Sequence, residues 1–324
     1  MTGTAIGEFD LIRRCFTRAR DASAPGIVLG IGDDAALLAP SPGCELAVSV
    51  DTLVAGVHFP ADTPPTDIGW KSLAVNLSDL AAMGATPRAC FLALTLPQAE
   101  ETWCTEFARG FFALADSAGC ALAGGDTTSG PLSITVTVFG EVPAGSALRR
   151  SGARPGDLVC VSGTPGEAAL GLARWQAGNH DAPDAAIARL LRPSPRLALG
   201  TALRGIASAC IDVSDGLLGD LAHILRASGE LGADIDLPAL PRAASLAALS
   251  DDSFYDHVLA GGDDYELCFT VPAALYEQAI AAGKTAGVAV SVIGRVTPVG
   301  GIRCLDAGGN IRPVTRHSWE HFTP

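Results

Sequence analysis

The stretch TDIGWKSLAVNLSDLAAMG, at residues 66–84, decides how the chain folds. Leu73, Leu77 and Leu80 recur at the spacing of one helix face, and Gly84 supplies a stop. We therefore predict a helix over 66–84 that turns its apolar face toward a core. Asp79, near the end of this segment, is one of several acidic residues with small neighbours.

Apolar runs on both sides of this helix predict strands. GIVLGI (26–31) and ELAVSV (45–50) are typical of buried strands that end at polar turns, which would place Asp33, Asp34 and Asp51 at strand ends. Further strands are expected at 88–96 and 132–140, with a helix at 99–118 between them. Residues 7–20 predict an N-terminal helix.

The segment ALRRSGARPGD (147–157), rich in Gly, Pro and Arg, predicts a domain boundary. A chain of 324 residues exceeds the usual size of one hydrophobic core, so we expect two domains, residues 1–150 and 151–324. Beyond the boundary, DLVCVSG (157–163) begins an alternation of strands and helices. The predicted fold class is α/β, or α+β in its broader sense.

The composition limits the environment and the partners. A formal charge of −13 disfavours nucleic acid or an anionic membrane as partner. The nine cysteines include no CxxC pair and lie mostly in apolar stretches, as expected of buried thiols in a reducing compartment. The N-terminus lacks the basic and apolar regions of a signal peptide, and charged residues interrupt every long apolar stretch. We therefore expect a cytoplasmic protein.

Acidic residues beside glycine, serine or threonine carry the strongest functional signal. They occur in GIGDDAA (30–36), SVDT (49–52), NLSDLAAMG (76–84), GGDTTSG (124–130), DVSDG (212–216) and GGDDYE (261–266). Carboxylates are the hard oxygen ligands that Mg²⁺ prefers beside phosphates, and small neighbours let a ligand approach the backbone. Each segment could equally be a turn or a helix cap. If the acids converge, they indicate a phosphate site with several metal ions.

Two familiar nucleotide motifs are excluded. GIGDDA fits G-x-G-x-x-A, but two carboxylates occupy the place of the pyrophosphate, and Pro40 and Pro42 end any following helix. Gly283, Lys284 and Thr285 imitate the end of a P-loop, yet Gln278 stands where its leading glycine should be. If the chain binds ATP, it does so by another architecture.

Taken together, these segments resemble the thiamine-monophosphate kinases, in the superfamily that includes aminoimidazole ribonucleotide synthetase. The resemblance covers nearly the whole chain and is carried by the order and spacing of the acidic segments, VDTLVAGVHF (50–59), NLSDLAAMGATP (76–87) and RSGARPGD (150–157). It implies two α/β domains of the aminoimidazole ribonucleotide synthetase-like fold and a homodimer formed through the N-terminal sheets. It also implies magnesium ions and ATP as co-substrate.

The resemblance assigns roles residue by residue. The metal ligands would be Asp33, Ser49, Val50 through its carbonyl, Asp51, Asp79, Asp126, Asp212 and Asp215. The nucleotide would meet Gly125, Asp126, Arg150 and Ser214, and thiamine monophosphate would meet His58, Asp263 and Trp319. Asp51, Asp126 and Arg150 would be central to catalysis. Asp263 stands where many relatives carry glutamate in a GEDYEL sequence.

Some of these residues keep ordinary alternatives. His58 could be a turn histidine, Arg150 a solvated charge and Trp319 a surface-packing aromatic. Among whole-protein alternatives, an aminoimidazole ribonucleotide synthetase would leave VDTLVAGVHF and Trp319 unexplained. A regulator that binds nucleotide or metal without turnover is disfavoured because the ligand set is complete.

The implied reaction is direct, in-line transfer of the γ-phosphoryl group of ATP to a phosphate oxygen of thiamine monophosphate. No covalent enzyme intermediate is needed. The acceptor oxygen is already ionised, because the second pKa of a phosphate monoester is about 6. The main obstacle is repulsion between two polyanions, which metal ions and Arg150 would reduce.

Overall fold

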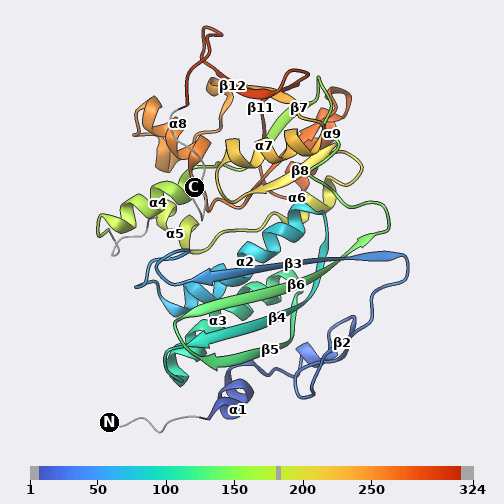
Figure 1. The fold of residues 1–324 in the computed structure, drawn as a ribbon, viewed down its shortest axis with the longest axis vertical. Helices are drawn as coiled ribbons and strands as arrows, with labels where there is room; N and C mark the ends of the chain where they lie inside the picture. The colour runs from blue at the N-terminus through green and yellow to red at the C-terminus, as the bar shows by residue number, and fades with distance from the viewer. Residues whose placement is uncertain (1–6, 180–183, 315–324) are drawn as a thin grey trace. The chain divides into compact units, whose positions relative to one another are not determined.

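A computed structural model describes residues 7–179 and 184–314 of the chain. The chain divides into two compact units, each with its own sheet (Figure 1). The first unit contains the residues up to Leu80 together with Ala85–Gly145. The second contains Ala81–Gly84 and the residues from Ser146 onward. The predicted arrangement of two mixed α/β parts is confirmed.

The first unit is built on a four-stranded sheet. Its strands lie in the spatial order β3 (Cys44–Val54), β6 (Ser133–Pro143), β4 (Thr86–Leu96) and β5 (Ala121–Ser129). β4 and β5 are parallel, and the other pairs are antiparallel. β3 and β5 are therefore the two edge strands, which matters for the position of the acidic residues.

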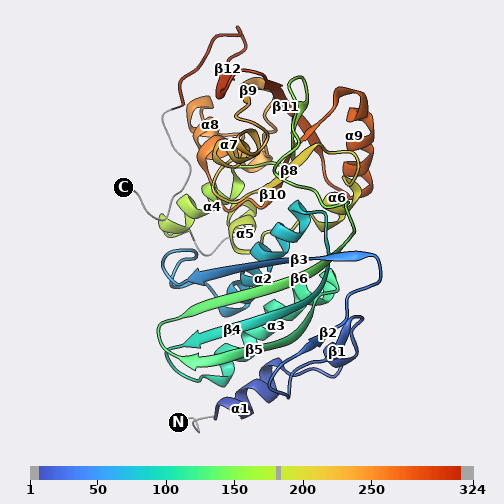
Figure 2. The same ribbon diagram turned by 45° about the vertical axis from the view of Figure 1, so that its right-hand side comes forward.

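Two long helices cover one face of this sheet, α2 (Pro65–Ala82) and α3 (Glu101–Ala118), as Figures 1 and 2 show. Both were expected from the sequence at nearly these bounds. Glycines let the two helices approach closely, because a Cβ on Gly69 would collide with the carbonyl oxygen of Phe107. A Cβ on Gly110 would likewise collide with the carbonyl oxygen of Thr66. The backbones of α2 and α3 are therefore in direct van der Waals contact at these two glycines.

The N-terminal segment is less regular than predicted. In place of one helix over 7–20, α1 (Glu8–Leu11) passes into a π-helical turn (Ile12–Phe16), and the amide of Thr17 donates to the carbonyl of Ile12. Because of the wider turn, Leu11 and Phe16 are both buried although five positions separate them. A 3-10 turn (Asp21–Ser23) and the short strands β1 (Ile27–Leu29) and β2 (Leu37–Leu38) follow.

The prediction that Asp51 lies at the end of a strand is wrong, since Ser49 and Asp51 both lie inside β3. Asp126 also lies inside a strand, β5, and not in a turn, whereas Asp79 lies inside α2, in agreement with the helix predicted over 66–84. In β3 these polar residues alternate with exposed apolar ones, so the strand continues through the polar positions instead of ending at them. Asp33 and Asp34 do follow β1, as expected.

The second unit has a six-stranded sheet with helices on both faces. Its strands lie in the order β12 (Gly301–Leu305), β9 (Gly232–Asp236), β11 (Val290–Thr297), β7 (Leu158–Ser162), β10 (Glu266–Val271) and β8 (Ala209–Val213). Only β12 and β9 pair in parallel. Alternate residues of β7 enter different cores, since Val159 and Val161 pack in one and Cys160 in the other.

The helices of the second unit fall into groups by the core they serve. They are α4 (Glu167–Gln176), α5 (Ala185–Leu191), α6 (Leu197–Ala202), α7 (Leu217–Ala227), α8 (Asp251–Ala260) and α9 (Tyr276–Thr285). α7 and α8 contribute to the core that contains Val159, and α6 and α9 to the core that contains Cys160. Short 3-10 turns lie at Leu237–Ala239, Ala244–Leu246 and Ala273–Leu275.

The cysteines are free thiols, and all except Cys44 are buried, as the sequence predicted. Desolvation raises the pKa of the Cys160 thiol to about 12, which keeps it protonated and unreactive. Across residues 7–179 and 184–314, no helix combines the length and apolar character needed to cross a membrane.

The contact between α2 and α3 gives a stability prediction. Gly69→Ala should lower the free energy of unfolding by about 1–3 kcal/mol, because the added methyl group forces two packed helices apart. Gly7→Ala is the matched control, since a Cβ there meets nothing within 4 Å. Urea unfolding would measure both variants. Equal unfolding midpoints for Gly69→Ala and the wild type would contradict the close contact.

Candidate functional site

The edge strand β3 and helix α2 hold one group of predicted metal ligands together. The hydroxyl of Ser49 donates to a carboxylate oxygen of Asp79 at 2.5 Å. The amide of Asp51 donates to the side-chain oxygen of Asn76 at 3.0 Å, and Asn76 is fully buried. Asn76 was not predicted, although it lies in NLSDLAAMG. It fixes the backbone of β3 beside Asp51.

The neighbours of this group have distinct orientations. The side chain of Val50 is 58% exposed on the opposite face of β3, which leaves its carbonyl as the only group it could offer a metal. At the end of the strand, the amide of Val54 donates to Nδ1 of His58 at 3.0 Å. The turn role of His58 is thus present in the structure. The same bond fixes the orientation of its ring.

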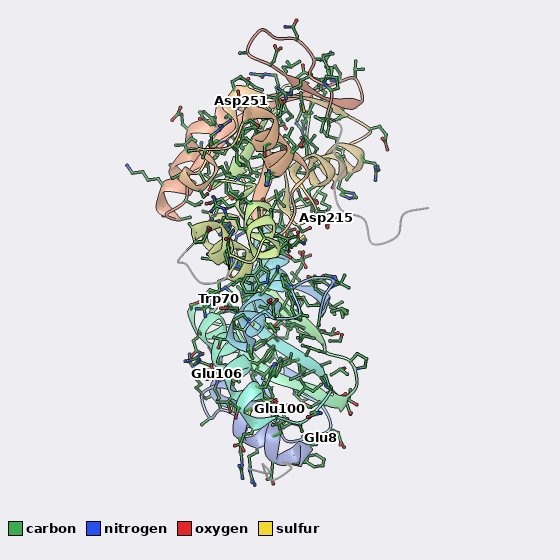
Figure 3. All side chains as sticks on the ribbon, turned by 90° about the vertical axis from the view of Figure 1, so that its left-hand side faces the viewer. Glu8, Trp70, Glu100, Glu106, Asp215 and Asp251 are labelled. Atoms are coloured by element: carbon green, nitrogen blue, oxygen red, sulfur yellow. The ribbon has the colours of Figure 1, made fainter. Side chains whose placement is uncertain are left out.

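A cavity of about 830 Å³ in the first unit brings a second group together. It is lined by α1 and the π-helical turn after it, the GIGDDAA loop, residues 91–92 of β4 and residues 122–127 of β5, and includes Asp33, Gly125 and Asp126. Glu8 on α1 lies at this end of the unit (Figure 3). A side chain at Gly125 would collide with the carbonyl oxygen of Leu92, so glycine is required there. The cavity unites two of the glycine–aspartate motifs.

The two groups of the first unit lie at opposite edges of its sheet. Asp51 pairs with Val136, Val136 with Leu92, and Leu92 with Gly125. Gly125 and Asp51 are therefore in register but three strand spacings apart, about 14 Å. Within one chain, Asp51 and Asp126 cannot share a metal ion.

In the second unit, the DVSDG segment runs from the end of β8 through the loop that precedes α7. Asp212 is in β8 and is buried, whereas Asp215 is exposed at the surface of the loop (Figure 3). The carboxylate of Asp220 accepts the amides of Ser214, Asp215 and Gly216 at 3.1–3.2 Å. Sequence reasoning missed Asp220. By holding the amides inward, it shapes the loop that carries Ser214 and Asp215.

The buried position of Asp220 also changes its titration. Desolvation, with a smaller contribution from the charge of Asp215, raises the pKa of Asp220 to about 7. The three amide hydrogen bonds act in the opposite direction by favouring the ionised form. Asp220 is thus buried beneath the loop as a hydrogen-bond acceptor.

Asp263 lies against this same loop. Its amide donates to the carbonyl of Ser214, and the amide of Tyr265 donates to the carbonyl of Val213, both at 2.8 Å. The hydroxyl of Tyr265 donates to the carboxylate of Asp263 at 3.1 Å. The structure therefore brings a predicted substrate residue next to a predicted nucleotide residue within one unit.

Arg150 is exposed, which agrees with its alternative role as a solvated charge. Its backbone is nevertheless held by a specific contact. The hydroxyl of Ser228, just after α7, donates to its carbonyl oxygen at 3.5 Å. On α7, desolvation and then the charges of Arg150 and Arg226 lower the pKa of His223, while Asp215 acts in the opposite direction. Arg150 and Asp215 thus both lie near the exposed side of α7.

Trp319 and a shared metal centre are the last of the predicted features. Trp319 lies outside the described residues. Among residues 7–179 and 184–314, no group of three or more His, Cys, Asp or Glu residues could hold a metal ion. The predicted ligand set includes a hydroxyl, a carbonyl and carboxylates from separate places, so it does not form a ready cage. Mg²⁺ generally completes its shell with water and substrate phosphates.

Comparisons with known proteins find one matching domain for each of the two units. The sequence model described as AIR synthase related protein, N-terminal domain, matches residues 32–142, and that of the C-terminal domain matches residues 154–306. The thiamine-monophosphate kinase of Salmonella typhimurium is 52% identical over 273 residues, 83% of either chain.

Solved structures are similar as well. The crystal structure of thiamine-monophosphate kinase from Stenotrophomonas maltophilia has a TM-score of 0.86 and 48% identity, and the match covers 95% of this chain and 99% of that one. A structure of AaThiL complexed with AMPPCP and TMP has a TM-score of 0.77 and 29% identity, with 88% and 89% covered.

Asp220 gives the prediction for this site. Asp220→Ala should lower the free energy of unfolding by about 2–4 kcal/mol, because amides of the loop lose their acceptor. Asp220→Asn should cost less, since its amide oxygen can still accept. The exposed Glu277 of α9 offers a control, and Glu277→Ala should change stability by less than about 0.5 kcal/mol. Both variants would be measured by denaturant unfolding. If Asp220→Ala lost no more unfolding free energy than Glu277→Ala, Asp220 would not anchor the loop.

Proposed function

The chain belongs to the thiamine-monophosphate kinase family of AIR synthase related proteins, and from this membership we propose that it transfers the γ-phosphoryl group of ATP to thiamine monophosphate. The product is thiamine diphosphate, so the protein is a phosphotransferase of thiamine diphosphate biosynthesis. The observation that carries the proposal is the cavity in which GIGDDAA and GGD meet, in a chain 52% identical to such a kinase.

The nucleotide would be bound by residues that the structure leaves accessible. Gly125 lets a phosphate approach the backbone, and Arg150 offers an exposed guanidinium. Ser214 lies in the loop that Asp220 anchors. AaThiL binds AMPPCP, an analogue of ATP, together with TMP, which supports a site that holds both substrates at once. ATP is therefore the co-substrate.

The thiamine side would be bound by His58, Asp263 and Trp319. Thiazolium is a permanent cation, so the carboxylate of Asp263 would attract it. Asp263 is one methylene shorter than the glutamate of many relatives, but Tyr265 holds its carboxylate through a hydrogen bond. An aromatic face such as that of Trp319 attracts a cation by roughly 0.5–2 kcal/mol.

The predicted donor set fits magnesium. Ser49 and Asp79 direct hard oxygen atoms at each other, and Asp33, Asp126 and Asp215 have exposed side chains. The residues that would hold the ions are Asp33, Ser49, Val50, Asp51, Asp79, Asp126, Asp212 and Asp215. Bound there, magnesium would neutralise phosphate charge and orient both substrates.

The chain's own residues would act mainly by positioning. The acceptor phosphate needs no strong general base, because its second pKa is about 6. Arg150 would offset the negative charge on the transferring group, and the anchored loops would keep nucleophile and leaving oxygen in line. No side chain needs to form a covalent bond with the phosphoryl group.

We also propose that the protein is a cytoplasmic homodimer. Exposed apolar residues line the open face of β3: Leu46, Val48, Val50 and Val54. Such a row on one sheet face is typical of a protein interface. Within one chain the β3 ligand group and the cavity are about 14 Å apart, whereas paired metal ions lie about 4 Å apart, so a metal site that used both groups would need a second copy of the chain. The charge of −13 argues against nucleic-acid or membrane partners.

The activity is tested by assaying thiamine monophosphate, thiamine and formylglycinamidine ribonucleotide with ATP and Mg²⁺. Of the three acceptors, only thiamine monophosphate should receive a phosphoryl group from ATP. Asp51→Asn and Asp126→Asn should each lower kcat by about a hundredfold or more while thermal unfolding stays close to wild type. Glu277→Gln is the control and should keep full activity. Folded aspartate variants with wild-type turnover would show that these acids are structural.

The dimer is tested at Val48, which is 55% exposed. Val48→Glu should halve the mass measured by light scattering after size exclusion, because a charge would have to be buried at the interface. Val299→Glu is the control, since Val299 is 75% exposed in the second unit. A wild-type protein of monomer mass, or a dimeric Val48→Glu variant, would disprove this interface.

A further inference from the structure

A buried ionic network lies directly behind Asp263. Glu266 begins β10 and is 1% exposed. Its carboxylate accepts the hydroxyl of Ser162 at 2.5 Å and is paired with both Arg189 and Arg196. Arg196 spans the two carboxylate oxygens as a fork, with its Nε donating to Oε2 at 2.7 Å. None of these residues has a role in the site described above.

The same network reaches the residue between Asp263 and Tyr265. The Asp264 carboxylate is fully buried and accepts the amides of Gly166 and Ala168, at 2.6 and 3.1 Å. The main-chain carbonyl of Asp264 accepts a hydrogen bond from the guanidinium group of Arg189 at 2.9 Å. Asp264 and Glu266 thus anchor the loop inward on either side of Tyr265.

The residues between these anchors have a backbone conformation that side chains disfavour. Asp263 has φ of 69° and Tyr265 has φ of 51°. Among the non-glycine residues of 7–179 and 184–314, only Glu230 shares this positive φ. Such a conformation persists when surrounding contacts enforce it. Here the enforcing contacts are the anchors at 264 and 266, together with the amide bonds of Asp263 and Tyr265 to the 213–214 carbonyls.

Two guanidinium groups face two buried carboxyl groups in this network, and desolvation raises the pKa of Asp264 to about 7. Arg189 and Arg196 carry two positive charges and keep side-chain exposures of 12% and 21%. Asp264 and Glu266 supply the acids. Arginine suits this place because its planar fork can hold both oxygens of Glu266, which the single ammonium group of lysine cannot do in the same way.

We propose that Arg189 and Arg196 are positioning residues for thiamine monophosphate, which act through Glu266 to hold Asp263 in its substrate-binding conformation. This inference rests on the proposed function, because it takes Asp263 as the contact to the thiazolium. Loss of the fork lets the 262–266 loop relax toward ordinary φ values. The Asp263 carboxylate then leaves its place, while Ser214 is still held through its amide by the carboxylate of Asp220.

The test compares Arg196→Lys and Arg196→Met with the matched pair Arg303→Lys and Arg303→Met. Arg303 makes a similar fork with Asp234, at 2.6 and 2.7 Å, on the edge strand β12 and its neighbour β9 of the same sheet. The Arg196 variants should raise KM for thiamine monophosphate about tenfold or more, with the lysine variant less affected, and leave KM for ATP within about twofold. The Arg303 variants should match wild type in both constants.

Amide hydrogen exchange provides a readout that needs no turnover. In Arg196→Lys, the amides of Asp263 and Tyr265 should exchange about tenfold faster or more, because their bonds to the 213–214 carbonyls open with the loop. If Arg196→Met does not fold, the lysine variant decides. Unchanged exchange, an unchanged KM for thiamine monophosphate, or equal rises in both KM values would overturn the proposal. A wild-type protein that fails to phosphorylate thiamine monophosphate would instead refute the function, and the exchange rates would still judge the positioning.

Discussion

Hydrogen bonds between main-chain amides and buried polar side chains are the constraint on which the rest of this site depends. Asn76 holds the amide of Asp51, Asp220 holds amides of the Ser214 loop, and Asp264 holds amides at the start of α4. An exposed residue that is proposed to bind a phosphate or a metal, such as Asp215, cannot also fix its own backbone by packing. A second, buried residue performs that task.

This division of labour explains why the acids tolerate one another. Among residues 7–179 and 184–314, exposed carboxylates such as Asp33 and Asp215 form no group of three or more acids close enough to hold a metal ion. Their mutual repulsion is therefore small until substrate phosphates and cations arrive together. Buried acids avoid repulsion in another way. Glu266 has two arginines, and Asp220 has three amides.

The sequence predicted the parts of the structure that depend on local pattern. The helix expected at 66–84 is α2, because leucines at helical spacing and a terminal glycine determine it almost alone. The placement of Asp51 and Asp126 inside strands was missed, since aspartate and glycine beside threonine suggest turns when pairing partners are unknown. Edge strands accept such residues because one side of the backbone has no neighbouring strand.

The supporting residues could not be predicted for a different reason. Asn76 and Asp220 are polar residues in helices, and nothing in the local sequence separates them from solvated ones. Their importance comes from contacts with β3 and with the loop before α7, which only the fold brings near. The roles of the acids came from a family resemblance instead. Trp319 lies outside the residues that could test its assignment.

Strand β3 carries the polar residues predicted to be ligands on one face and exposed apolar side chains on the other. Because successive side chains alternate, inserting or deleting one residue would exchange the two faces. Valines would then point at Asn76 and Asp79, and aspartate and serine would replace the apolar row. A one-residue shift of β3 would therefore disrupt both the proposed metal site and the proposed dimer interface. The length of β3 should therefore be fixed in evolution more strictly than the identity of any single valine on it.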